Sequence, residues 1–314
     1  MLVKRRAGAR SAVALLAGAL ALSALTACDS EANADPAGKI RVVAGFYPLQ
    51  YVAEQVGGDR VNVTNLAQPG AEPHDLELSP RQMASIVDAD LVIYLDGFQP
   101  AVDEAVKQEA RKTSFDAATV VPLINVTTTP EPGADAPETA AGNKDPHVWL
   151  DPERLATVAG ALADRLTTAD PAGADTYRQG AASLRARLGE LDQTYANTLR
   201  DCQRREIVVG HAAFGYLAER YDLRQVAIEG LSPETEPTPR HLAQVAAQAK
   251  QHAATTIFFE TLASPKVAQV IATEVGATTA VLDPIEGLLP GSGDDYLSVM
   301  RANLQTLKPA LGCA

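Results

Sequence analysis

Short runs rich in valine and isoleucine alternate along the chain with longer segments whose apolar residues recur at helical spacing. Predicted strands lie near residues 40–45, 61–67, 91–95 and 120–123 in the first half, and near 206–210, 225–229, 256–260 and 279–282 in the second. Strands that alternate with helices indicate βαβ units, which build mostly parallel sheets. The pattern therefore predicts an α/β fold with two (β/α) lobes.

Helix starts are marked at three places where a residue that favours the N-cap position precedes a proline. The pairs are Ser79-Pro80, Asp151-Pro152 and Ser264-Pro265. The side-chain oxygen of an N-cap residue accepts a hydrogen bond from a free backbone N–H, and proline suits the first helical position. Gln82 stands three residues after Ser79, which completes a capping box. We expect a helix after each pair.

Two long helical patterns occupy the middle of the chain. Residues 152–168 and 173–202 are rich in alanine, leucine, arginine and glutamate, and only Asp170-Pro171 interrupts them. A helix over the second segment is about 45 Å long. Because one lobe does not need such a length, we predict a rigid helix that bridges the lobes and allows only modest motion on ligand binding.

The two halves share a short repeat. The sequence GFYPLQYVAE (45–54) aligns without a gap on GHAAFGYLAE (210–219), so in each half a strand ends in glycine and a helix follows. His211 therefore lies at the carboxyl end of the first strand of its half. In open α/β sheets, ligands bind at that edge.

The N-terminal segment has the features of a targeting signal. Four basic residues precede an apolar stretch over 11–25, which is too short for a membrane span. The following Leu25-Thr26-Ala27-Cys28 resembles a bacterial lipobox, in which the chain is cut before a cysteine that carries the lipid. We predict lipidation of Cys28; an ordinary secretory signal with an incidental cysteine is the alternative.

The charge and the length of the mature chain limit its partners and its number of domains. Four of the 27 basic residues and none of the 39 acidic ones lie within residues 1–27, so cleavage leaves a net charge of −16. Such an acidic chain has no basic stripe for nucleic acid, and we expect no nucleic acid to bind.

The length of the mature chain suits two domains. The predicted division is a signal peptide over 1–27, a tether over 28–38, an N-terminal lobe over 39–172, a linking helix over 173–202 and a C-terminal lobe over 203–314.

Two further cysteines remain after cleavage, Cys202 and Cys313. Thiols outside the plasma membrane tend to oxidise, so an even pair favours a disulfide bond. A metal site of two cysteines and two histidines is the competing interpretation, but neither cysteine lies near a histidine motif. We predict the disulfide.

Three of the five histidines stand in similar loops after apolar runs. They are His74 in GAEPHD (70–75), His147 in DPHVWLDP (145–152) and His211 in VVGH (208–211), and Asp283 in VLDP (281–284) continues the series at gaps of 73, 64 and 72 residues. Imidazole nitrogens and one carboxylate suit a borderline divalent cation, and four such groups close a tetrahedral site. The sequence therefore predicts a metal site made by His74, His147, His211 and Asp283.

Other residues near these loops have alternative roles. Glu260, at a predicted strand end, is either a rival oxygen ligand or a partner that orients an imidazole. Glu72, Asp145 and Asp151 flank the histidines and are expected to orient them or to cap helices. His241 and His252 lie in a helix with a polar face, where we expect them to be solvated.

Enzyme motifs are absent from the sequence. It contains no His-Glu-x-x-His pair, no phosphate-binding glycine loop and no Gly-x-Ser-x-Gly elbow. A catalytic zinc keeps an open position for water, which four protein ligands would close. A secreted zinc hydrolase with three histidines, a water and Glu260 as base is the enzymatic alternative.

Five motifs together resemble one protein family. The segments EPHDLELSP (72–80), DPHVWLDP (145–152), GHAAFGYL (210–217), LSPETEPTP (231–239) and LDPIEG (282–287) are similar to signatures of the zinc/manganese solute-binding lipoproteins of bacterial ABC importers. The resemblance implies two lobes joined by one long helix, with the metal between them. It also implies an extracytoplasmic monomer, lipid-anchored to the outer face of the plasma membrane, that feeds a permease driven by an ATPase.

The resemblance also addresses which metal is carried. Members that select manganese often have glutamate where His211 stands, so the nitrogen-rich set favours Zn²⁺ as the transported ion, with Mn²⁺ as the alternative. Zinc-uptake members frequently have a histidine-rich loop before the second ligand. Here residues 127–144 contain no histidine, and we expect only a mobile surface loop.

Overall fold

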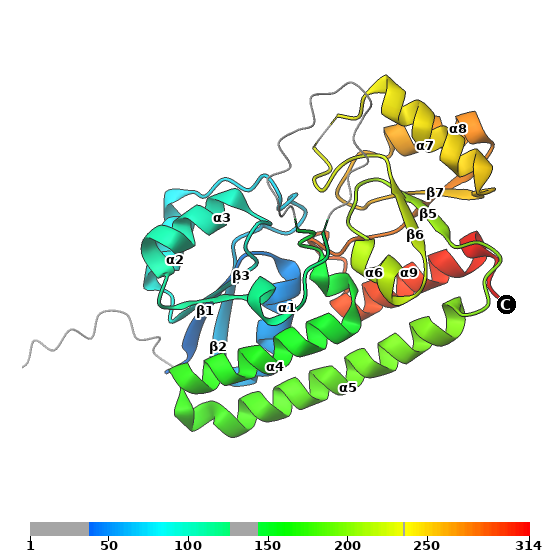
Figure 1. The fold of residues 1–314 in the computed structure, drawn as a ribbon. Coiled ribbons are helices and arrows are strands. Elements are labelled where there is room, and N and C mark those ends of the chain that lie inside the picture. The colour runs from blue at the N-terminus through cyan, green and yellow to red at the C-terminus, as the bar shows by residue number, and fades with distance from the viewer. Residues whose placement is uncertain (1–37, 126–143, 235) are drawn as a thin grey trace, which may run out of the picture. The chain divides into compact units, whose positions relative to one another are not determined.

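The computed structural model describes residues 38–125, 144–234 and 236–314, and within these ranges eight strands form two parallel four-stranded sheets (Figure 1). The predicted signal peptide, the lipidated Cys28, nearly all of the tether and residues 127–143 of the predicted loop lie outside the described residues. The α/β fold predicted from the hydrophobic pattern is confirmed.

The first sheet has the strand order β2-β1-β3-β4. Its strands are β1 (Ile40–Ala44), β2 (Val61–Asn65), β3 (Leu91–Tyr94) and β4 (Ser114–Asp116), and all neighbours are parallel. Successive side chains point to opposite faces, so Val42 packs into the large central core while Val43 packs under α2 (Pro80–Asp88) and α3 (Pro100–Ala105).

The second sheet repeats this topology with the order β6-β5-β7-β8. It contains β5 (Glu206–Val209), β6 (Arg224–Ala227), β7 (Thr256–Phe259) and β8 (Thr278–Val281). Val209 faces the central core, whereas Val208 faces α7 (Pro239–Gln251) and α8 (Lys266–Val275). In both sheets the order reverses at the first strand, which creates a ligand-binding switch point at the carboxyl edge.

Five more α-helices complete the described structure. They are α1 (Tyr47–Gly57), α4 (Pro152–Ala169), α5 (Ala174–Leu199), α6 (Gly215–Arg220) and α9 (Tyr296–Leu311). Short turns of 3₁₀ or π helix connect some elements: Gly58–Arg60, Val106–Ala110, Ala117–Val120, Val148–Leu150 and Pro171–Gly173.

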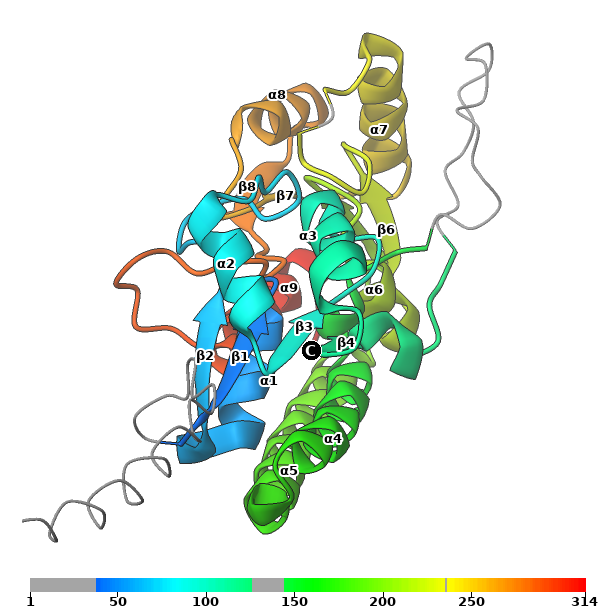
Figure 2. The same cartoon turned by 90° about the vertical axis from the view of Figure 1, so that its left-hand side faces the viewer.

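The long helix α5 contacts elements of both halves. It runs beside α4 (Figures 1 and 2) and packs against α1 of the first half and α9 of the second. Its 26 residues span about 39 Å. Buried side chains recur along it every three or four residues: Tyr177, Ala181, Leu184, Leu188, Leu191, Tyr195 and Leu199. This stripe gives the helix an apolar face on the shared core.

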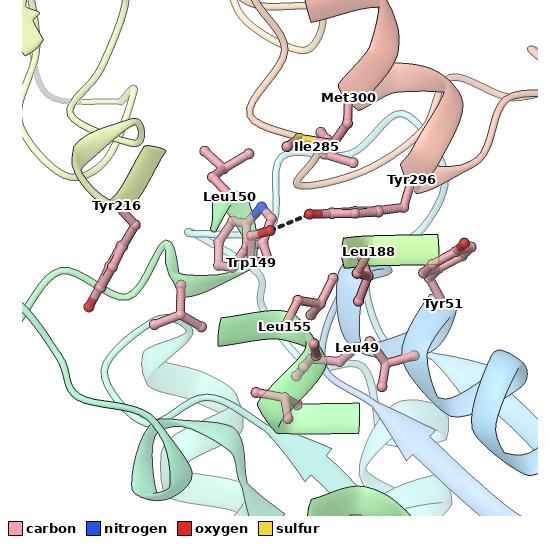
Figure 3. Packing of buried hydrophobic residues seen from close by; sticks show 14 of the residues in the cluster. Leu49, Tyr51, Trp149, Leu150, Leu155, Leu188, Tyr216, Ile285, Tyr296 and Met300 are labelled. Atoms are coloured by element: carbon pink, nitrogen blue, oxygen red, sulfur yellow. Dashed lines mark hydrogen bonds between the residues drawn. The ribbon is translucent and has the colours of Figure 1, made fainter. Parts of the chain in front are cut away.

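One hydrophobic core is continuous between the two sheets. It includes residues from α1, α4, α5, α9 and both sheets, and Figure 3 shows Tyr51, Trp149 and Tyr296 within it. The Tyr296 hydroxyl donates to the Trp149 carbonyl oxygen at 2.5 Å. The described residues accordingly belong to one compact unit, so the lobe boundaries given above stay a prediction.

Two local predictions were wrong. The fourth strand lies at Ser114–Asp116 and not at 120–123, because the Asp116 carboxylate accepts from the Ala118 N–H and starts a 3₁₀ turn. Helix α8 begins at Lys266 with Pro265 as N-cap, and Ser264 makes no cap bond. The capping box of Ser79 and the cap by Asp151 are confirmed.

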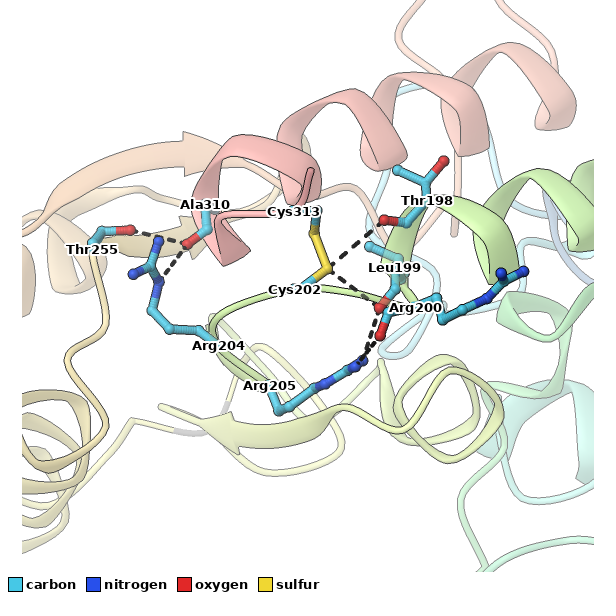
Figure 4. The surroundings of a disulfide bond; sticks show 9 residues. All are labelled: Thr198, Leu199, Arg200, Cys202, Arg204, Arg205, Thr255, Ala310 and Cys313. Atoms are coloured by element: carbon cyan, nitrogen blue, oxygen red, sulfur yellow. Dashed lines mark hydrogen bonds between the residues drawn. A yellow bond between two sulfur atoms is a disulfide. The ribbon is translucent and has the colours of Figure 1, made fainter.

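The chain end is fixed covalently. Cys202, just after α5, forms a disulfide bond with Cys313, just after α9 (Figure 4), as predicted. Within the described residues, no helix combines the length and the apolar character needed to cross a membrane.

Candidate metal centre

His74 lies in the loop between β2 and α2, beside the carboxyl edge of the first sheet. Its backbone N–H donates to Glu72 at 2.8 Å, and its ring packs on Phe98 with 4.4 Å between centroids. The buried Gln99 donates to the carbonyl oxygens of Gly45 and Pro73, both at 3.2 Å. The loop that carries His74 is thereby bonded to the end of β1.

His147 follows Pro146 and precedes the 3₁₀ turn that contains Trp149. The side chain is fully buried. One oxygen of Asp145 accepts from both the backbone N–H of His147, at 2.9 Å, and its ring Nδ1, at 2.8 Å. A proton on Nδ1 leaves Nε2 with a free lone pair, so Asp145 orients the ring for metal binding.

His211 directly follows Gly210 at the carboxyl end of β5 and is also fully buried. Glu260, at the end of the neighbouring β7, repeats the arrangement of Asp145. Its Oε1 accepts from the backbone N–H of His211 at 2.9 Å and from the ring Nδ1 at 2.7 Å. A Cβ at Gly210 would lie 2.5 Å from that oxygen, so only glycine leaves room for the carboxylate.

The three histidines converge on Glu286, in the turn that follows β8. The Glu286 Oε1 lies 3.2 Å from Nε2 of His74, 3.3 Å from Nε2 of His147 and 3.1 Å from Nε2 of His211. The Nε2 atoms of His147 and His211 are 3.3 Å apart. All four side chains are buried.

These separations match a tetrahedral metal site. Donor atoms 2.0–2.1 Å from a tetrahedral zinc ion lie about 3.3 Å from one another. Four of the six donor separations fall between 3.1 and 3.3 Å, and all lie within 4.8 Å. Three imidazoles and one carboxylate are a donor set that zinc accepts readily, so the residues fit the metal.

Asp283 does not join this group, although the sequence predicted it as the fourth ligand. Its carboxylate accepts from the Ile285 N–H at 2.7 Å and from the Thr261 hydroxyl. Both oxygens therefore hold the turn, and the side chain three residues later, Glu286, reaches the histidines instead. The described residues contain no other group of three or more potential ligands that converge in this way.

The site also shifts the proton affinities of its imidazoles. Burial lowers the pKa of His74 below its usual value. Burial acts in the same direction on His147, but its bonds to Asp145 and Glu286 outweigh this effect and raise the pKa. At His211 burial is again opposed, chiefly by the charge of Glu286, and the pKa lies well above the usual value. The carboxylates thus favour the protonated form of His147 and His211, whereas burial disfavours that of His74.

The pKa values of the two buried carboxyl groups, Glu286 and Glu72, are shifted in opposite directions. Burial would raise the pKa of Glu286, yet the surrounding imidazoles hold it well below its usual range. At Glu72, burial and the charge of Glu286 outweigh the bond from the His74 backbone N–H and the charge of His211, and the pKa rises to about 8. The imidazoles thus favour the ionised form of Glu286, which is the form that can bind a cation.

Glu286 could not be identified from residue spacing. It belongs to the motif LDPIEG, but Asp283 stands directly after the strand, where sheet-edge ligands are expected. Between the two residues, Ile285 adopts φ 61°, a conformation that a β-branched residue rarely takes. Because of this turn, Glu286 and not Asp283 lies among the histidines. The glutamate in that motif was the one available signal.

Two parallel sheets whose carboxyl edges supply buried imidazoles and a carboxylate to one point define a class of α/β metal-binding protein. The chain belongs to the ZnuA family, "Zinc-uptake complex component A periplasmic", whose model matches residues 42–310. The family predicted from the five motifs is confirmed.

Curated relatives and solved structures agree with this membership. The chain is 36% identical over 289 residues to the zinc-binding protein AdcA of Streptococcus pyogenes serotype M6, covering 86% of this chain and 56% of AdcA. It is 33% identical over 291 residues to the high-affinity zinc uptake system protein ZnuA of Bacillus subtilis, covering 90% of this chain and 91% of that protein. The Zn(II)-bound ZnuA-like domain of Streptococcus pneumoniae AdcA superposes with a TM-score of 0.73 at 34% identity, covering 87% and 99%. The chain thus spans just over half the length of the streptococcal AdcA relatives.

Proposed function

We propose that this protein is the extracytoplasmic binding component of an ABC importer, which captures one Zn²⁺ and delivers it to the membrane permease. The main support for this proposal is the tetrahedral spacing of four buried donor atoms, which belong to His74, His147, His211 and Glu286. The donors come from loops at the carboxyl edges of both sheets, so a bound ion would link the two halves.

Zinc is favoured over manganese by the donor types. Three nitrogens and one carboxylate in a closed site suit Zn²⁺, whereas Mn²⁺ prefers oxygen-rich, octahedral surroundings. The relatives named as zinc proteins support the same choice. Competition between the two ions in equilibrium dialysis tests it, and preferential retention of Mn²⁺ would contradict it.

A carrier role is favoured over hydrolysis by the number of protein ligands. Catalytic zinc sites keep a position for water, whereas four protein donors close the coordination sphere. We therefore propose that the protein binds zinc without catalysing a reaction. Hydrolysis of ester or phosphate substrates by the zinc-loaded protein, lost in the Glu286→Ala variant, would refute this.

The proposed partners follow from transport. We infer a permease and its ATPase as partners of a lipid-anchored monomer on the outer face of the membrane, with Cys28 as the anchor. A pneumococcal relative is named a zinc-binding lipoprotein, which supports this. Metabolic labelling of cells with a fatty acid should mark the wild-type protein and leave the Cys28→Ala variant unlabelled.

Equilibrium dialysis against Zn²⁺ tests the binding itself. One tight equivalent per chain is expected, and His147→Ala should lower the affinity by more than the roughly 10–100-fold loss typical of an outer-shell partner. His241 on α7 provides the control, because its Nε2 lies 3.2 Å from the carbonyl oxygen of Ala227 at the end of β6 and does not belong to the site. His241→Ala should bind as wild type; wild-type protein without bound zinc at neutral pH would refute the proposal.

A further inference from the structure

The turn that carries Glu286 has an unusual backbone. Ile285, directly before the glutamate, adopts φ 61°. A β-branched residue in the left-handed region is strained, and such strain persists only when surrounding contacts impose it. The Ile285 side chain is also fully buried. The contacts that impose this conformation therefore decide where Glu286 points.

Asp283 provides the first of these contacts from within the turn. Its Oδ1 accepts the Ile285 N–H at 2.7 Å, and its Oδ2 accepts the Thr261 hydroxyl from the segment after β7. The bond to Ile285 closes a side-chain turn that fixes the backbone of the strained residue. The bond to Thr261 keeps the carboxylate from rotating away.

Two further side chains bond the turn from other elements. Asn303 of α9, itself 2% exposed, accepts the Asp283 N–H at 2.9 Å and donates to the Asp283 carbonyl oxygen at 2.7 Å. The Trp149 indole N–H donates to the Pro284 carbonyl oxygen at 2.6 Å. Figure 3 shows Trp149, Ile285 and Tyr296 within the same buried cluster. The turn is thus bonded from three sides.

We propose that Asp283 is a positioning residue of the metal site, which holds Glu286 among the imidazoles by fixing the strained turn. This inference rests on the proposed function. Asp283 does not touch the metal, because its oxygens are bonded to Ile285 and Thr261 and lie outside the convergent group. It acts on affinity only through Glu286.

A double-mutant cycle separates this role from a general structural one. Zn²⁺ affinity, measured by competition with a fluorescent chelator, should fall about 10–100-fold in Asp283→Ala, as for other partners that orient a ligand. In the Glu286→Ala background the same substitution should cost no further affinity, because there is no carboxylate left to position. A general structural defect would lower affinity in both backgrounds.

Conservative variants guard against loss of folding. Asp283→Asn should keep most of the affinity, because an amide oxygen can accept from Ile285 and the Thr261 hydroxyl can accept from the amide nitrogen. Thr261→Val preserves shape and removes only the hydroxyl. It should lower affinity less than Asp283→Ala, and again only when Glu286 is present.

A matched control is Asp295, whose carboxylate caps α9 in the same half through the Ser298 N–H at 2.7 Å. Asp295→Ala should lower the melting temperature and leave the affinity unchanged. Equal losses from Asp283→Ala in both backgrounds, or none in either, would overturn the inference while the wild type still binds zinc. Wild-type protein that fails to bind zinc would instead overturn the proposed function.

Discussion

The indole N–H of Trp149 bonds to the carbonyl oxygen of Pro284 at 2.6 Å, so the loop of His147 is joined directly to the turn of Glu286. The two segments are 135 residues apart in the sequence and come from different halves of the fold. This bond aligns two of the four donors before any ion arrives.

Removing that bond should affect both stability and binding. Trp149→Phe keeps an aromatic ring in the core but leaves the buried Pro284 oxygen without a partner, at a cost of about 1–3 kcal/mol in the free energy of unfolding. Urea unfolding measures this loss, and Zn²⁺ affinity should fall as well. Tyr195→Phe is the control, since it removes a similar buried bond, to the Met300 carbonyl oxygen at 2.6 Å. Equal weakening of zinc binding by Tyr195→Phe and Trp149→Phe would contradict a role of the Trp149 bond in aligning the donors.

The carboxylate behind His211 should set affinity without touching the metal. Glu260→Gln removes the charge that stabilises the Nδ1 proton, and we expect about 10–100-fold weaker binding. Glu274 on α8 pairs with Lys250 at 2.9 Å on the surface, away from the histidines, so Glu274→Gln serves as a control that keeps wild-type affinity. Isothermal titration calorimetry measures both. Identical affinities for the two variants would contradict an orienting role for Glu260.

Zinc binding should release protons at neutral pH. The pKa of His147 and of His211 is raised, so metal-free protein holds protons on these rings that the ion must displace. Because a raised pKa means that protons compete over a higher pH range, affinity should rise with pH through neutrality and fall on acidification. Glu286, with its lowered pKa, contributes no proton.

Calorimetry in two buffers with different ionisation enthalpies counts these protons. The observed enthalpy should differ between the buffers at pH 7, and the difference should shrink at alkaline pH as the imidazoles lose their protons beforehand. An enthalpy independent of buffer at pH 7 would show that the rings are already neutral.

Reduction of the Cys202–Cys313 bond should destabilise the protein. The bond closes a loop with a sequence separation of 111 residues, which corresponds in the loop-entropy model to about 4–5 kcal/mol. Urea unfolding with and without reductant measures the loss. The double variant Cys202→Ser/Cys313→Ser should match reduced wild type and should not respond to reductant. An unchanged urea midpoint in reduced wild type would contradict the prediction.

Much of the fold follows from local patterns. Seven of the eight described strands lie at the positions that the valine- and isoleucine-rich runs predict, because buried parallel strands read as continuous apolar segments. The strand at Ser114–Asp116 was missed because it has only three residues, of which Phe115 alone is buried. The continuity of the core between the halves also depends on tertiary packing that no single segment reveals.

Some residues of the metal site could likewise be predicted from local sequence patterns, and one could not. His74, His147 and His211 could be selected because each follows an apolar run and stands in a stiff loop. Glu286 could not, since its direction depends on the left-handed Ile285 and on bonds from Asn303, which is distant in the sequence. Such a turn contradicts local preference and is held by tertiary contacts.

A crystal structure of the zinc-loaded protein, with anomalous scattering recorded at the zinc edge, would show whether the three histidines and Glu286 bind one ion together. We predict one peak bonded at about 2.0–2.2 Å by Nε2 of His74, His147 and His211 and by a carboxylate oxygen of Glu286. A peak bonded by Asp283, or one that lacks ligands from one of the two halves, would contradict this ligand set.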